Sequence, residues 1–138
     1  MKVKCVHTES LSKISLGHPP RKFPVKAYYD DVLQVGKIYT VYAQSVWADA
    51  INYLIDAPVN KEANPLWASA NLFEITNPSL PGGIFFQYYG ADDKRGVQAL
   101  WGYKELIFDY SHYEKLIDME DEVISIFLKR QQEIDARS

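Results

Sequence analysis

Four side chains in the sequence could bind a transition metal: Cys5, His7, His18 and His112. A structural zinc site needs four ligands that usually come as two close pairs, spaced C-x2-C or H-x3-H, because each pair must reach one ion from a short segment. Only Cys5 and His7 are neighbours here, and the two other histidines are scattered. The spacing argues against zinc, and Cys5 is interpreted as a small buried apolar residue. The sequence therefore predicts no metal and no cofactor.

Motifs for nucleophilic catalysis and for phosphate binding are missing from the sequence. It contains no G-x-S-x-G elbow, no G-x-G-x-x-G and no G-x-x-x-x-G-K-[ST]. Residues 10–13 (SLSK) match the S-x-x-K motif of penicillin-binding enzymes, but the companion motifs S-D-N and K-T-G are absent. A pattern with two free positions arises by chance, so we assign it no role.

Adjacent carboxylates occur at positions 30–31, 92–93 and 120–122. General acid–base catalysis needs two carboxyl groups in different environments, one of them usually shielded from water. Acidic runs in predicted loops and on the polar face of a helix are normally solvated. The sequence thus predicts a protein that is not an enzyme, with no catalytic residue.

Nucleic-acid binding is disfavoured by charge. Small β-barrels that bind single strands stack bases on tyrosines and contact phosphates with lysines. The candidates here are Tyr28, Tyr29, Tyr39, Tyr42, Tyr88 and Tyr89 for stacking, and Lys22, Lys26 and Lys37 for phosphate. The chain, however, has 15 Lys and Arg against 18 Asp and Glu, a net charge of -3 and a pI near 5.6. Such binders present a strongly basic surface, so we expect no nucleic-acid partner.

Length and composition predict one soluble domain over residues 1–138. At 138 residues, 47% of them hydrophobic, the chain can bury a core without metal or disulfides. No apolar run reaches the roughly 18 to 20 residues that cross a bilayer, and the first ten residues turn polar before a signal peptide could form. With its single cysteine, Cys5, the chain fits a reducing compartment. We therefore expect a cytoplasmic protein without membrane contact.

Six short segments have the β-branched and aromatic composition of strands, and turn signals separate them. They are residues 3–7, 37–46, 51–55, 71–76, 84–89 and 97–101. A tight turn at Ala48 and Asp49 joins the second and third as a hairpin. Residues 8–34 contain three prolines and no sustained period, which predicts a long irregular connection.

A helical period follows over residues 111–135. Ser111 and Glu114 match the S-x-x-E capping box, and apolar residues then recur at helical spacing. Asp118 could cap a second helix and divide the segment, a boundary that the sequence leaves open. The prediction is an α+β fold, mainly β over residues 1–110. A strongly bent antiparallel sheet or an SH3-like β-barrel of about six strands would be closed by this C-terminal helical segment.

Aromatic and acidic residues supply the candidate binding surface. The chain has 10 Tyr, 6 Phe and 3 Trp, more than a small core needs, and Tyr and Trp often anchor protein contacts. Consecutive tyrosines in a predicted strand point to opposite faces, so only one of Tyr88 and Tyr89 faces inward. An acidic helix face would speed the encounter with a basic partner. The predicted partner-binding residues are Tyr88, Tyr89, Asp92, Asp93, Glu114, Asp118, Asp121 and Glu122.

The order of these elements and several short aromatic segments of the sequence resemble those of small immunity proteins from bacterial toxin and immunity clusters. The similar segments are residues 35–42 (VGKIYTVY), 53–55 (YLI), 65–67 (PLW), 72–75 (LFEI) and 101–106 (WGYKEL), within a stretch from about residue 35 to 135. The resemblance implies a cytoplasmic antidote that binds a cognate protein toxin and covers its active site. It assigns no individual residue a role.

Two other function classes stay open at this point, as does the oligomeric state. A small-molecule-sensing or regulatory domain would show an apolar pocket with convergent polar groups between sheet and helix. A small hydrolase would show a buried carboxylate with a strongly shifted pKa in a cleft beside Asp92 or Asp30. An antidote would present a flat or convex acidic surface.

Overall fold

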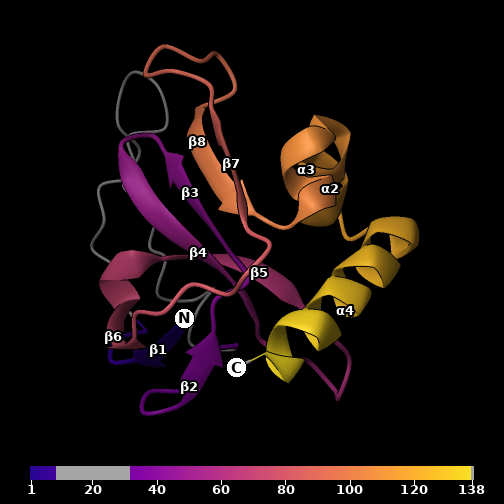
Figure 1. Cartoon of the computed structure of the whole chain (residues 1–138). Helices are drawn as coiled ribbons and strands as arrows, with labels where there is room; N and C mark the ends of the chain where they lie inside the picture. The colour runs from indigo at the N-terminus through magenta and orange to yellow at the C-terminus, as the bar shows by residue number, and fades with distance from the viewer. Residues whose placement is uncertain (9–31, 138) are drawn as a thin grey trace.

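The computed structural model describes residues 1–8 and 32–137, which form two antiparallel sheets and three α-helices (Figure 1). The strands are β1 (Lys2–Cys5), β2 (Ile38–Thr40), β3 (Ala43–Trp47), β4 (Ala50–Asp56), β5 (Pro65–Ser69), β6 (Phe73–Asn77), β7 (Phe85–Tyr88) and β8 (Val97–Gly102). The helices are α2 (Lys104–Phe108), α3 (Tyr110–Ile117) and α4 (Asp121–Ala136), and a 3-10 turn spans Ala70–Leu72. The predicted α+β class is confirmed.

The small sheet has the strand order β2-β1-β6 and the large sheet β5-β4-β3-β8-β7. Every pairing within them is antiparallel. Among the described strands neither sheet closes on itself, so the SH3-like barrel is not confirmed. Most of the predicted loop 8–34 lies outside the described residues.

The predicted strand over residues 37–46 is wrong in one respect, because it is two strands in different sheets. β2 pairs with β1 in the small sheet, and β3 pairs with β4 and β8 in the large one. The chain crosses between the sheets at Val41 and Tyr42, which are both buried. A continuous β-favouring composition cannot show this change of sheet, since both strands need the same residue types.

The large sheet separates two hydrophobic cores. On β4, Tyr53 and Ile55 pack into the core shared with the small sheet, and Leu54 packs into the core shared with the helices. This alternation follows from the two-residue period of a strand. Figure 1 shows α2 and α3 beside the large sheet and α4 across its lower part, with β1 and β6 away from α2 and α3.

Two local features of the large sheet show how the sequence builds it. The predicted hairpin turn is confirmed: Ala48 and Asp49 both have positive φ, 49° and 65°, as a two-residue type I′ turn requires. In β8, a Cβ atom on Gly102 would lie 2.6 Å from Leu106 Cδ2 and 3.0 Å from Ala43 Cβ. Glycine at this position therefore lets α2 approach the sheet closely.

The helical segment begins earlier than predicted. The prediction that Ser111 and Glu114 form a capping box is wrong. Asp109 caps α3 instead, because its Oδ1 accepts hydrogen bonds from the Ser111 backbone N–H at 3.0 Å and from the Ser111 hydroxyl at 2.6 Å. The division into two helices is confirmed. Asp118, however, ends α3 rather than starting α4, which begins after Glu120. No helix in the described part of the chain is long and apolar enough to cross a membrane.

Candidate functional site

The first group of predicted partner residues lies on β7 and the turn after it. Tyr88, the last residue of β7, is exposed, and Tyr89 is half-buried. Asp92 is exposed, whereas the Asp93 carboxylate is bound to Arg95 through Nε at 3.0 Å and Nη2 at 2.9 Å. These hydrogen bonds hold the pKa of Asp93 below its usual value. Asp93 therefore orients Arg95.

Arg95 in turn covers two aromatic rings. Its guanidinium carbon lies 3.9 Å from the ring centroid of Tyr110 and 4.9 Å from that of Tyr89. Such cation–π contacts favour a guanidinium over the face of an aromatic ring. Tyr89 and Tyr110 also touch each other edge to face, with centroids 5.7 Å apart. Tyr89 thus belongs to a structural cluster that closes the β7–β8 turn against α3.

The second group of predicted residues surrounds the connection between α3 and α4. Glu114, Asp118, Asp121 and Glu122 are all exposed. Asp121 also lines an open groove of about 700 Å³ between residues 56–63 and the first half of α4. No hydrogen bond or ion pair among the described residues joins this group to the first. The structure thus places the predicted residues in two groups, one on β7 and the turn after it and one on α3, α4 and their connection.

An aromatic surface on β7, which we call the edge patch, extends beyond the residues predicted. It consists of Phe85, Phe86, Tyr88 and the neighbouring Phe108 of α2, whose exposed fractions range from 40% to 69%. Phe85 packs edge to face on Phe108 at 5.1 Å between centroids, and Phe86 lies on Trp101 at 4.7 Å. The sequence contained a signal for this patch: the run IFFQYY has aromatic residues at both alternating positions and no charge.

The backbone of β7 is open on one side. β7 is the last strand of the large sheet and pairs only with β8 among the described strands. The Tyr89 N–H donates to Gln98 O at 2.8 Å, so antiparallel alternation directs the peptide groups of Phe86 and Tyr88 away from β8. In agreement, the Tyr88 N–H donates to the side-chain oxygen of its neighbour Gln87 at 3.2 Å. The free edge can therefore accept a further strand.

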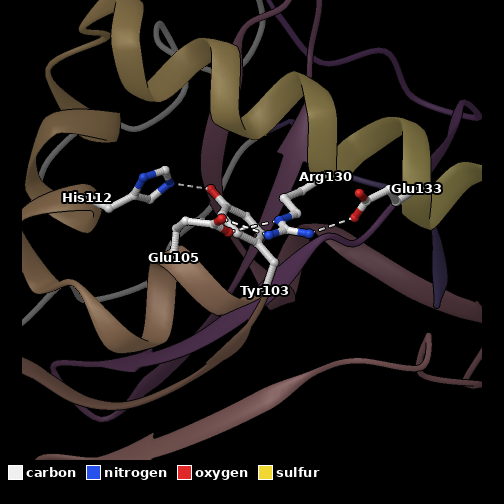
Figure 2. A network of polar contacts seen from close by, with 5 residues as sticks. All are labelled: Tyr103, Glu105, His112, Arg130 and Glu133. Atoms are coloured by element: carbon white, nitrogen blue, oxygen red, sulfur yellow. Dashed lines mark hydrogen bonds and ion pairs between the residues drawn. The ribbon is translucent and has the colours of Figure 1, made fainter.

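A polar network links the end of β8 to all three helices (Figure 2). The Tyr103 hydroxyl lies 2.6 Å from His112 Nε2, in the buried part of the network. Arg130 of α4 donates from Nε and Nη2 to both oxygens of Glu105, at 2.8 and 2.7 Å. Its Nη1 donates to Glu133 at 2.8 Å. The network therefore ties α4 to α2, and α3 to the end of β8.

Burial and hydrogen bonding set the protonation states in this network. Burial lowers the pKa of His112, although Glu105 and Asp109 partly oppose the shift. Burial raises the pKa of Tyr103, and the hydrogen bonds from Arg130 lower the pKa of Glu105. At neutral pH the buried pair is therefore a neutral imidazole and a protonated hydroxyl. Sequence reasoning missed this pair, because nothing in the spacing of residues 103 and 112 predicts the hydrogen bond.

A cavity of about 190 Å³ lies next to the network. Residues 82–85 form one side of it, the start of α2 a second and the last turns of α4 a third. Its apolar lining comes from Ile84, Phe85 and Ile134 together with Tyr103, and its basic lining from Lys104, Arg130 and Arg137. Three distant segments meet here, so no local sequence pattern could predict the cavity.

Two features would indicate a metal site or a hydrolase: a cluster of metal ligands, and a buried carboxylate with a strongly shifted pKa. No group of three or more His, Cys, Asp or Glu side chains in residues 1–8 and 32–137 is placed to hold a metal ion. The shifted carboxyl pKa values, those of Asp93, Glu105 and Asp109, are all lowered by hydrogen bonds. Asp30, one of the two positions named for a hydrolase, lies outside the described residues. Compared with family models, curated proteins and solved structures, the chain matches none.

Proposed function

We propose that the protein is a non-enzymatic, cytoplasmic binding protein that neutralises a cognate bacterial protein toxin. The observation that supports this function best is the edge patch, an uncharged aromatic strand with a free backbone edge. Proteins usually protect edge strands with lysine, proline or a bulge, because an open edge pairs with other chains. β7 (FFQY) carries no charged residue and no proline. An edge of this kind fits a partner that adds an extended segment to the sheet.

The binding mode follows from the geometry of β7. An added strand would take hydrogen bonds from the outward peptide groups of Phe86 and Tyr88, and its side chains would pack on the exposed rings. Aromatic side chains are frequent among residues that dominate binding energy. The exposed acidic residues of α3 and α4, from Glu114 to Glu122, would steer a basic toxin toward the protein and raise the association rate.

A growth assay with the product of the neighbouring open reading frame tests the proposal. We expect that this product stops growth when expressed alone, and that co-expression of the protein restores growth and yields a stable complex. Absence of toxicity, or toxicity that the protein does not relieve, would overturn the antidote function.

A matched pair of variants tests the binding surface. Phe86→Lys puts a charge on the β7 edge, whereas Ile75→Lys puts one on β6, the outer strand of the small sheet. The two positions are equally exposed, at 52% and 54%. We expect Phe86→Lys to weaken the complex at least tenfold and Ile75→Lys to leave it unchanged, with similar unfolding midpoints. Equal binding by both variants would show that the edge patch is not the surface that binds the toxin.

Small-molecule sensing is the second candidate function. The observation in its favour is the cavity of about 190 Å³ between the sheet and α4, which combines apolar walls with convergent polar groups. Its test is a ligand that binds this cavity in the isolated protein.

A further inference from the structure

We propose that the cavity beside α4 binds a small organic monocarboxylate, with its charge between Arg137 and Lys104 and its apolar part against Phe85. This inference deepens the second candidate function, small-molecule sensing. It does not depend on a toxin partner.

The charges around the cavity select an anion. Arg130 is already neutralised, because it donates to the carboxylates of Glu105 and Glu133. Arg137 is different: its Nη1 donates to a neutral acceptor, the Gly82 carbonyl, at 2.9 Å. That contact uses one of the five N–H groups of a guanidinium. Lys104 has no hydrogen-bond or ion-pair partner within the part of the chain that the structure describes. Among the described residues, two positive charges therefore remain at the cavity without a carboxylate of their own.

The balance of charge favours a single negative charge on the ligand. Lys104, Arg130 and Arg137 supply three positive charges, and Glu105 and Glu133 supply two negative ones, so the cluster is left with one positive charge. A dianionic phosphate would carry more negative charge than the one positive charge of this cluster can balance. The carbonyl end of α4 carries partial negative charge and opposes an anion there. Lys104, which belongs to α2, is therefore needed beside Arg137.

Two features place Arg137 at the cavity: its backbone position at the end of α4 and a hydrogen bond of its guanidinium. Arg137 follows the last residue of α4, and its guanidinium is tied to the chain at Gly82. A Cβ atom on Gly83 would lie 3.3 Å from Arg137 Nη1, so a side chain at position 83 would crowd this contact. The glycine at position 83 thus leaves the guanidinium room beside the backbone. A held guanidinium loses less entropy when it binds a carboxylate than a free one does.

The size of the cavity limits the ligand. Its volume of about 190 Å³ is smaller than the roughly 300 to 1,000 Å³ of pockets for drug-sized molecules. A cavity of this size favours a small ligand over a nucleotide or a large cofactor. A carboxylate on a short aromatic or branched aliphatic group is a small ligand of this kind, and Phe85 and Ile84 offer its apolar part a surface.

Titration of the full-length protein with three simple carboxylates tests the inference. Phenylacetate, benzoate and isovalerate would be added to ¹⁵N-labelled protein, and the amide signals of Gly82 and Gly83 followed. Phenylacetamide and inorganic phosphate serve as comparison ligands. We expect saturable shifts with at least one carboxylate and at least tenfold weaker binding of phenylacetamide and phosphate. No saturation with any of the three carboxylates would overturn the proposal. So would equal or tighter binding of the amide or of phosphate.

Charge variants locate the site. Arg137→Gln and Lys104→Gln should each weaken carboxylate binding at least fivefold. Lys129→Gln removes an exposed positive charge from α4 that does not line the cavity, and it should change binding less than twofold. Equal weakening by Lys129→Gln would mean nonspecific charge attraction and would overturn the assignment. The titration uses no partner protein, so its failure leaves the antidote function standing, and a failed growth assay leaves this inference standing.

Discussion

The Tyr103 hydroxyl lies 2.6 Å from His112 Nε2, and only 3% and 2% of these two side chains are exposed. The two rings meet edge to face, with centroids 5.3 Å apart. Tyr103 follows β8, and His112 lies in the first turns of α3. The hydrogen bond therefore fixes α3 relative to the large sheet, at a place where water cannot replace either partner.

We expect stability to fall when the pH drops below about 6.5, the usual pKa of histidine. Burial lowers the pKa of His112 in the folded state, so in this range the unfolded chain takes up a proton that the folded protein refuses. The free energy of unfolding then decreases as the pH falls, by at most about 1.4 kcal/mol per pH unit, until the folded state is protonated too. Urea unfolding at pH 7.5, 6.5 and 5.5 measures the slope. His112→Gln should flatten it, and an unchanged slope in this variant would contradict the prediction.

Tyr103→Phe should lower the free energy of unfolding by about 1 to 3 kcal/mol, because it leaves the buried His112 Nε2 without its partner. Tyr88→Phe is the control, since it removes a hydroxyl from an exposed ring. Such a surface change should cost less than about 0.5 kcal/mol. Urea unfolding of both variants compares the two, and equal costs would show that the buried hydrogen bond adds nothing.

Phe127→Ala should cost about 3 to 5 kcal/mol, the usual loss when a buried phenylalanine leaves a cavity. Phe127 is fully buried in the core between the helices and the large sheet, where it packs edge to face on Tyr42 at 5.5 Å between centroids. Leu128→Ala changes the next residue, which is exposed, and should cost much less. The midpoints of urea unfolding, with unchanged m-values, report both losses. An unchanged midpoint for Phe127→Ala would refute the packing of α4.

Ala48→Asn should stabilise the protein by about 1 kcal/mol, because a β-carbon is strained at positive φ and asparagine tolerates this region better. Ala48 has a φ of 49° in the turn between β3 and β4. The second turn residue, Asp49, stays unchanged, because its carboxylate accepts a hydrogen bond from Gln98 at 2.8 Å. The thermal unfolding midpoint should rise. A fall would mean that the methyl group of Ala48 packs better than the turn geometry suggests.

Strong local signals predicted part of the fold. The β-favouring composition of residues 51–55 and the turn residues Ala48 and Asp49 predicted a hairpin that is present. The strand β5 (Pro65–Ser69) was missed, because most of its residues are buried whichever face they occupy and they show no alternation. The helix α2 was missed because five residues are too few to show a helical period. The cap was predicted at Ser111 because the sequence does not show where α3 begins. The helix begins at Tyr110, which makes the preceding residue, Asp109, its cap.

The candidate site was less predictable than the fold. The sequence predicts that only one of Tyr88 and Tyr89 faces inward, and in the structure Tyr88 is exposed and Tyr89 half-buried. Their roles as partner residues stay predictions. The contact of Phe108 with Phe85, and the cavity between Gly82 and Arg137, depend on segments that only the tertiary fold brings together. A single sequence carries no signal for such long-range contacts.

The crossing at Val41 and Tyr42 links the unfolding of the two cores. Val41 belongs to the core under the small sheet, and the next residue, Tyr42, belongs to the core under the helices. Strand β4 contributes alternate side chains to both cores. If one core unfolds and β4 leaves its place, the other core therefore loses its β4 side chains as well. The amide hydrogens of β3 and β4, which are internal strands, should therefore exchange with solvent only through global unfolding.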